Sequence, residues 1–161
     1  MKIRIILILL LMSSVIIYAQ KPKKIKELKI KSITEIVYDN EKEQNGRKDA
    51  IIKYDGNGNE TEIIEYDKLN KITKHEQYFY NSEGKKIKEI HYLPNGKIEK
   101  TILTEFNSDN DKSKESEFDA KGKLVKTEIY KYKDDLRIEK KTMDYSGKFK
   151  SLRKYIYEYA K

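Results

Sequence analysis

Hydrophobic and polar residues alternate along most of the chain after residue 28, and short polar clusters interrupt the alternation at nearly regular intervals. The segments between the clusters are eight or ten residues long and rich in Ile, Thr, Tyr and Lys, as in Lys97 to Phe106 (KIEKTILTEF). This composition with a period of two is typical of β-strands. The pattern therefore predicts an all-β fold.

An aromatic residue opens each polar cluster and serves as its anchor. The anchors are Tyr54, Tyr66, Tyr80, Tyr92, Phe106, Phe118 and Tyr132. Successive anchors are 12, 14, 12, 14, 12 and 14 residues apart. The repeat is therefore a 26-residue double unit, made of one shorter and one longer hairpin.

The residue four positions after an anchor identifies the turn. It is Gly58, Asn70, Gly84, Gly96, Asn110 or Gly122 after the first six anchors. Gly and Asn accept a left-handed backbone at the lowest cost, and a three-residue hairpin loop needs such a residue to complete its type I turn. Consecutive hairpins predict an antiparallel meander of about ten strands. After Tyr132 the fourth residue is Leu136, so we expect a two-residue loop, Asp134-Asp135, at that place.

Three-residue loops pair residues whose numbers sum to an even value, so the even-numbered residues should share one face of the sheet. Nearly all aromatic residues from Tyr38 to Tyr132 are even-numbered. Leu28, Ile30 and Ile36 have the same phase, which predicts a first strand over residues 28–38. The register also predicts six anchor pairs: Tyr54 with Glu60, Tyr66 with Ile72, Tyr80 with Lys86, Tyr92 with Ile98, Phe106 with Lys112, and Phe118 with Leu124.

The centres of the predicted strands carry Lys and Glu on both faces. A two-layer sandwich would bury too many of these charges. We therefore expect a single elongated, twisted sheet, with a sheet curled on itself as the alternative.

The N-terminus has the layout of a secretory signal peptide. Two basic residues in Met1 to Arg4 precede the apolar run Ile5 to Met12, and Ala19 suits cleavage before Gln20. We expect a signal peptide over 1–19, a basic linker over 20–27 and one hairpin-repeat domain over 28–161. The protein would then be exported, with no transmembrane span in the mature chain; an uncleaved N-terminal anchor is the alternative.

Composition excludes several classes of protein. Cys is absent, which excludes disulfide scaffolds, thiol catalysis, cysteine zinc sites and a lipidated-cysteine anchor. Charged residues make up 39% of the chain, with Lys and Glu interspersed. The mature chain would carry 33 basic and 27 acidic residues, a modest net charge of +6. An exported chain of this kind is not expected to bind nucleic acid.

The Tyr-Asp-x-x-Gly-Lys signature, repeated from about Tyr38 to Lys148, resembles the tyrosine-aspartate (YD) repeats of the RHS family. It resembles less closely the MORN-variant repeats of exported bacterial proteins, since the glycine-rich MORN core is missing. The first resemblance implies a strip of β-sheet, in a chain too short to enclose a cargo as RHS-type shells do. The second implies binding or scaffolding. Neither family supplies catalytic residues that match this sequence.

His75 and His91 are the only histidines. Their numbers sum to 166, so the predicted register makes them directly opposite neighbours across a hairpin. Two imidazoles at that distance could bind a transition metal weakly, although no third ligand is evident beyond Glu89, Glu99 or Gln77. The alternative interpretation is two exposed strand residues.

The aromatic row is the main candidate for a binding surface. Its members are Tyr66, Tyr78, Tyr80, Tyr92, Phe106, Tyr130 and Tyr132, together with Phe118. Such an amphipathic strip could stack on sugar rings or hold a protein, and the alternative is that cross-strand aromatic pairs only stabilise the sheet.

No nucleophile-base pair, phosphate loop or metal triad is visible, so the sequence predicts neither an enzyme nor a cofactor. We hypothesise an exported, non-catalytic binding or structural module of the bacterial cell envelope, with a protein or glycan partner and an unknown oligomeric state. The competing hypothesis is a small metal-dependent factor or enzyme that uses His75 and His91.

Overall fold

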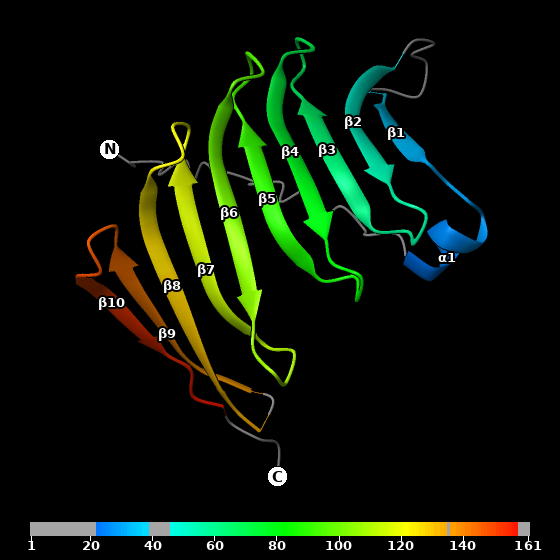
Figure 1. Cartoon of the computed structure of the whole chain (residues 1–161). Coiled ribbons are helices and arrows are strands. Elements are labelled where there is room, and N and C mark those ends of the chain that lie inside the picture. The colour runs from blue at the N-terminus through cyan, green and yellow to red at the C-terminus, as the bar shows by residue number, and fades with distance from the viewer. Residues whose placement is uncertain (1–21, 39–45, 135, 158–161) are drawn as a thin grey trace, which may run out of the picture.

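The computed structural model describes residues 22–38, 46–134 and 136–157, and they form one short helix and a ten-stranded antiparallel sheet. Neighbouring strands in the sheet are neighbours in the chain, from β1 at one edge to β10 at the other (Figure 1). The elements are α1 (Pro22–Glu27), β1 (Ser32–Val37), β2 (Arg47–Tyr54), β3 (Glu60–Tyr66), β4 (Ile72–Tyr80), β5 (Lys86–Tyr92), β6 (Ile98–Phe106), β7 (Lys112–Asp119), β8 (Leu124–Lys133), β9 (Leu136–Asp144) and β10 (Phe149–Lys154). The predicted all-β meander is confirmed.

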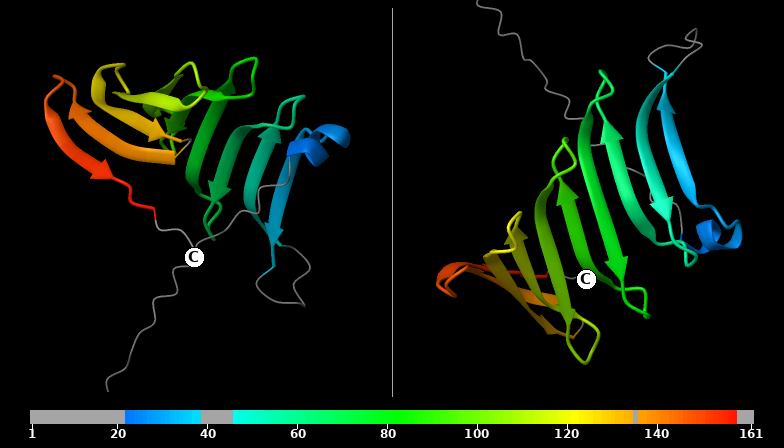
Figure 2. Two further views of the ribbon diagram at one scale, coloured as in Figure 1. Left: turned by 90° about the horizontal axis from the view of Figure 1, so that it is seen from below. Right: turned by 45° about the horizontal axis from the view of Figure 1, so that its top comes forward.

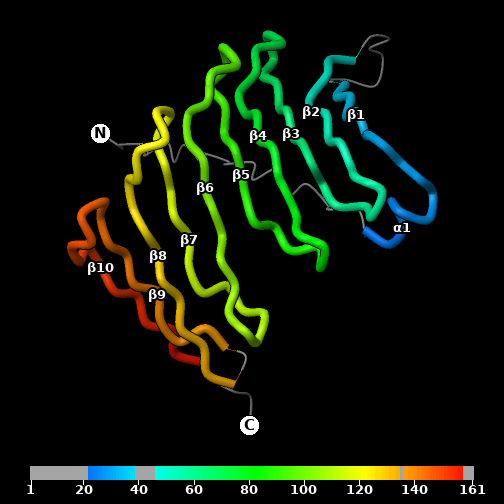
Figure 3. The backbone as a smooth tube through the Cα atoms, in the orientation of Figure 1, coloured from blue at the N-terminus to red at the C-terminus, as the bar shows by residue number. Residues whose placement is uncertain are grey.

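The sheet is open and strongly twisted. Figure 2 shows it as a curved strip in which β1 and β10 stay far apart, and Figure 3 shows the backbone winding continuously from one edge to the other. No second sheet lies against it among the described residues. The expectation of a single sheet is therefore confirmed, and the sheet does not curl up and close on itself.

The turns have the predicted geometry. Each left-handed position has a positive φ, from 58° at Asn70 to 83° at Gly58. In the first repeat, Gly58 N–H donates to the Asp55 carbonyl, and the Asp55 carboxylate accepts from the N–H groups of Asn57 and Asn59. This explains why Asp or Asn so often follows the anchor. At the late turn, Lys133 pairs with Leu136, which leaves the predicted two residues in the loop.

All six predicted anchor pairs are present. Between each anchor pair and the next pair away from the turn, however, the register shifts by one residue. The second strand of each hairpin carries one extra residue, a β-bulge, that has no partner on the first strand. These residues are Thr61, Thr73, Ile87, Glu99, Ser113 and Val125.

Because of the bulge, residues paired within the strands have numbers that sum to an odd value, as in Ile52 with Ile63. Even-numbered positions therefore change face from one strand to the next. The prediction that all even-numbered residues share one face is wrong.

We name the two faces by their members. The charged face carries Glu76, Tyr78, Glu89, His91, Glu115, Glu128 and Tyr130, and the apolar face carries Ile64, Tyr66, Ile90, Tyr92, Leu103 and Phe118. Side chains alternate along each strand, and the register relates the strands, so both assignments follow from the pairing.

The N-terminal region differs from its prediction. Pro22–Glu27 is a helix and not a linker, because Ile25 anchors it to the sheet with only 1% of its surface exposed. The first strand begins at Ser32 and not at Leu28, whose side chain is 57% exposed. Residues 1–19, the predicted signal peptide, lie outside the described residues. No helix in the described part of the chain is long and apolar enough to cross a membrane.

The hydrophobic core is small and lies near the N-terminal edge. Ile25 packs on Ile52, Tyr54 and Ile63, at the end of the charged face that α1 covers. The carbonyl oxygen of Pro22 lies only 2.2 Å from the place where a Cβ atom at Gly58 would stand. Gly58 therefore permits both the turn and the close approach of α1.

This double role gives a matched pair of substitutions. Gly58 and Gly122 both have left-handed backbones, so replacement by Ala costs roughly 1 kcal/mol at either site. Nothing lies within 4 Å of a Cβ at Gly122, whereas Gly58→Ala must displace α1 and expose Ile25. We expect Gly58→Ala to lose about 2 kcal/mol more than Gly122→Ala in urea denaturation. Equal losses would show that the contact between α1 and the turn does not stabilise the fold.

Candidate functional site

The predicted aromatic row is divided between the two faces. Tyr78, Tyr80, Phe106, Tyr130 and Tyr132 lie on the charged face, and Tyr66, Tyr92 and Phe118 lie on the apolar face. The bulge after each turn causes this division, since anchors of the shorter and longer strands then point in opposite directions. The structure does not bring the eight residues into one strip.

Cations cover most aromatic rings of the charged face. The Lys86 Nζ atom lies 4.5 Å from the centre of the Tyr78 ring. The Lys85 Nζ atom lies 5.0 Å from the centre of the Phe106 ring. The Arg137 guanidinium lies 4.8 Å from the centre of the Tyr130 ring. Each contact is a cation–π interaction within the chain, so these ring faces are not free to stack on a sugar.

The hydroxyl groups of these tyrosines are also engaged. Tyr78 donates to Glu76, and Tyr80 donates to the Glu60 carbonyl at 2.8 Å. Burial, followed by the nearby Glu60 carboxylate, raises the pKa of Tyr80 to about 12. Burial and the bond to Glu76 raise the pKa of Tyr78 as well. Both phenols stay protonated at physiological pH and act as fixed donors.

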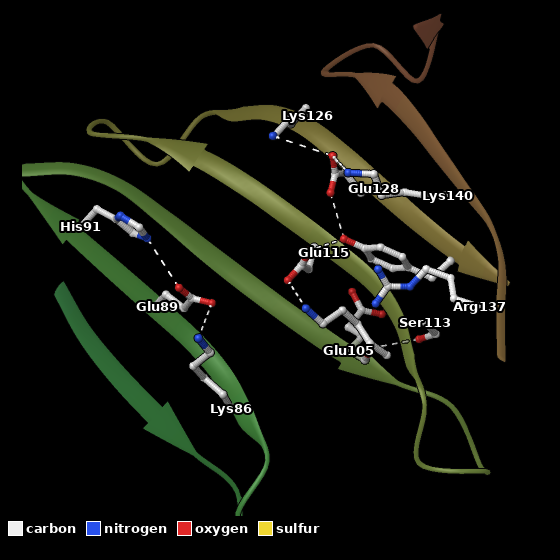
Figure 4. Close-up of polar contacts among 12 residues, drawn as sticks. Lys86, Glu89, His91, Glu105, Ser113, Glu115, Lys126, Glu128, Arg137 and Lys140 are labelled. Atoms are coloured by element: carbon white, nitrogen blue, oxygen red, sulfur yellow. Dashed lines mark hydrogen bonds and ion pairs between the residues drawn. The ribbon is translucent and has the colours of Figure 1, made fainter. Parts of the chain in front are cut away.

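A network of ion pairs fills the middle of the charged face (Figure 4). Some of its pairs lie within one strand and others join neighbouring strands. The ion pairs are Lys74 with Glu76 at 3.4 Å, Lys86 with Glu89 at 2.9 Å, Lys112 with Glu115 at 2.5 Å, Lys126 with Glu117 at 3.3 Å, and Lys140 with Glu128 at 2.9 Å. The His91 Nδ1 atom lies 3.1 Å from the Glu76 carboxylate. A single-layer sheet has little apolar surface to bury. On this face, contacts between charged side chains hold the strands together where another fold would have a hydrophobic core.

The network contains one unfavourable pair, because Glu115 and Glu128 are direct cross-strand partners. Like charges at that position destabilise a sheet. Lys112 and Lys140 each neutralise one of the two carboxylates. The Tyr130 hydroxyl lies within hydrogen-bond distance of both carboxylates, which share its single proton. Burial raises the pKa of Glu128, but the hydrogen bonds from Lys140 and Tyr130 outweigh it and hold the pKa below its ordinary value. The same balance lowers the pKa of Glu115.

The two histidines lie on opposite faces. His75 pairs with Ile64, and His91 pairs with Glu76. The prediction that they face each other is wrong, since the bulge in β5 moves the register by one residue. His75 instead stacks on the Tyr92 ring, with centroids 4.5 Å apart. Among the described residues, no three His, Cys, Asp or Glu side chains are arranged to hold a metal ion.

The apolar face carries an exposed strip that sequence reasoning missed. Ile98 and Leu103 are each 40% exposed, and with Phe118 and Thr101 they line a shallow cavity of about 390 Å³. We call these four residues the apolar strip. The signal for it was present in the sequence, but it could be found only by allowing for the bulge, because Ile98 and Phe118 are even-numbered and Leu103 is not.

Comparisons with known proteins identify no family. No family model matches the chain, and no curated protein matches it. Among solved structures, the chain is similar to a crystal structure of TarM, with 19% identity over 82% of this chain and 22% of that one, at a TM-score of 0.33.

Two further solved structures have similar scores. A TarM mutant from S. aureus, in complex with fondaparinux, α-GlcNAc-glycerol and UDP, has 17% identity over 78% of this chain and 22% of that one, at a TM-score of 0.32. The GtfA/B complex bound to UDP and GlcNAc has 14% identity over 70% and 24%, at a TM-score of 0.30. The chain spans less than a quarter of each, and likenesses this weak carry no argument about function.

The position of Tyr130 predicts a pH-dependent effect. Tyr130→Phe removes the donor between Glu115 and Glu128 and should cost about 1–2 kcal/mol of stability at pH 7. Because both carboxyls have lowered pKa values in the folded protein, the stabilisation they provide is present above their ordinary pKa near 4.5 and is lost as the pH falls below it. The difference in unfolding free energy between the wild type and Tyr130→Phe, measured by denaturation at several pH values, should therefore become smaller below about pH 4.

Tyr132→Phe is the matched control. The Tyr132 hydroxyl accepts only one long bond from Arg137, at 3.5 Å, among the described residues. This variant should show a smaller loss with no pH dependence. An equal and pH-independent loss in both variants would contradict the role assigned to Tyr130.

Proposed function

We propose that the protein is an exported, non-catalytic binding or structural module of the cell envelope, and that it holds its partner on the apolar strip. The observation that carries this proposal is the uncovered strip itself. Two half-exposed aliphatic side chains, Ile98 and Leu103, border a cavity in the middle of a sheet that has no second layer in the described residues. Exposed apolar surface of this kind is typical of an interaction site.

The charged face is a weaker candidate. Its carboxylates are paired within the chain, and Glu76, Glu89 and Glu128 have side chains only 14–15% exposed. A partner would have to break these pairs and leave a partly buried charge without its counterion, which is costly. The apolar strip can be covered without breaking any ion pair.

The chemistry of the strip favours a protein partner over a glycan. Aliphatic side chains such as Leu103 pack against apolar residues of another protein, whereas sugars bind mainly to exposed aromatic ring faces. His75 covers the Tyr92 ring, and Lys48 lies 5.4 Å from the centre of the Tyr66 ring. Phe118 is the one aromatic residue that lines the cavity.

Export is supported by the layout of residues 1–19 alone. The absence of Cys and the salt-bridged surface are compatible with any compartment. N-terminal sequencing of the protein recovered from the envelope fraction of the source cell tests export directly. We expect it to begin at Gln20.

Affinity capture with a substituted strip tests the binding surface. Leu103→Lys places a charge in the strip and should weaken capture of the envelope partner at least tenfold, as expected for an interfacial apolar anchor. Ile156→Lys is the control, because Ile156 is 91% exposed and lies beyond β10. Melting temperatures of both variants establish that the fold is intact. Equal capture by the wild type and a folded Leu103→Lys would show that the strip does not bind the partner.

A further inference from the structure

The segment around α1 is strongly basic. Five lysines lie between residues 22 and 31, against the single acid Glu27, and all five are exposed: Lys23, Lys24, Lys26, Lys29 and Lys31. Only Lys24 has an ion-pair partner among the described residues, Glu27 at 3.7 Å, and both side chains are at least half exposed. An ion pair this exposed contributes little stabilisation, and the other four lysines have no acid within ion-pair distance among the described residues. The segment therefore has a net positive charge. Along the strands, in contrast, lysines alternate with acids.

Apolar surface accompanies this charge. The Leu28 side chain, directly after the helix, is 57% exposed. The segment also lines a cavity of about 510 Å³ with the turn after β2, and Ile25, Ile30 and Tyr54 form the apolar part of its lining. Lys26, Lys29 and Lys31 line the same cavity, together with Asp55 and Gly56. We call the five lysines and Leu28 the α1 patch.

Lys29 occupies a position that its backbone disfavours. It has a φ of 53° at the end of α1, where Ile30 N–H donates to the Ile25 carbonyl at 3.0 Å and closes the helix. Glycine is the usual residue there, and a left-handed backbone costs other residues roughly 1–2 kcal/mol. The other described residues with positive φ are all Gly, Asn or Asp. At this position the chain has a lysine where the backbone conformation favours glycine.

We propose that the α1 patch binds the surface of a membrane that contains anionic lipids. Lysines at the edge of exposed apolar surface are the combination that interfacial segments use, since the cations attract lipid phosphates while the apolar side chains enter the headgroup region. A soluble polyanion would need only the lysines. Leu28 and the apolar cavity favour a lipid surface over nucleic acid or an acidic protein. This site is separate from the apolar strip, and its test does not depend on that proposal.

Vesicle co-sedimentation of the full chain tests the inference. The probes are phosphatidylcholine vesicles with and without phosphatidylglycerol. Residues 1–21 are the same in every variant, so a difference between variants reports on the substituted residues alone. We expect the wild type to bind anionic vesicles more tightly and to be released by salt.

The triple variant Lys23→Glu, Lys26→Glu and Lys31→Glu should weaken binding to anionic vesicles by at least about 100-fold, since each lysine near such a surface contributes a factor of roughly five and each new glutamate adds repulsion. Its control, Lys121→Glu, Lys148→Glu and Lys154→Glu, has the same net charge, and its three sites are exposed and remote from α1. Equal losses in both triple variants would overturn the proposal, because net charge alone would then explain binding.

Lys29→Gly and Leu28→Ser separate binding from stability. Lys29→Gly should raise the melting temperature, because Gly relieves the left-handed strain, and should weaken binding about fivefold. Leu28→Ser should weaken vesicle binding and leave binding to heparin, a soluble polyanion, unchanged. If Lys29→Gly stabilises the fold without loss of binding, or if Leu28→Ser has no effect on vesicles, the patch is not a lipid site.

Discussion

The extra residue on the second strand of every hairpin is the constraint on which the rest of the structure depends. A three-residue loop alone would keep one parity on each face, and one bulge per hairpin reverses that parity from strand to strand. The reversal places Tyr66, Tyr92 and Phe118 on one face, and Tyr80 and Phe106 on the other. Bulges also increase local twist, and the strongly twisted strip in Figure 2 is consistent with a bulge in each consecutive hairpin.

The separation of the aromatic residues determines how each face is stabilised. On the charged face, tyrosines alternate with lysines and glutamates. A cation covers the rings of Tyr78 and Tyr130, and their hydroxyl groups donate to carboxylate oxygens. One such contact contributes little to stability in water. The contacts stabilise the face because they form a connected network, in which the Glu115, Glu128 and Lys140 side chains are only 15–19% exposed. The apolar face has fewer charges and leaves aliphatic side chains uncovered.

Sequence reasoning predicted the features that have a local chemical signature. Left-handed turns require Gly58 or Asn70, and their spacing determines the strand order and the anchor pairs. The bulge residues share no such signature, since Thr61, Ile87 and Glu99 have nothing chemical in common. The faces could therefore not be assigned from the sequence. Helix α1 was missed because six residues are too short to show a helical period.

The candidate site was predicted less well than the fold for the same reason. Whether His75 and His91 meet, or whether eight aromatic residues form one strip, depends entirely on face assignment. A one-residue error in register moves every side chain of a strand to the other face of the sheet, and so changes which residues are neighbours. The lysines of residues 22–31 were visible in the sequence, but their meaning depends on Ile25, which fixes them at the edge of the sheet beside Leu28.

The two proposed surfaces lie on opposite sides of the sheet. Helix α1 packs on Ile52 and Ile63, which belong to the same face as the charged network, whereas Leu103 and Phe118 point the other way. A sheet held to a membrane through the α1 patch would therefore keep its apolar strip available to a second partner. The strip lies on β6 and β7, several strands from the β1 edge (Figure 1). A single-layer sheet suits this arrangement, because its small core occupies only the α1 end of the charged face and the apolar face has no second layer among the described residues.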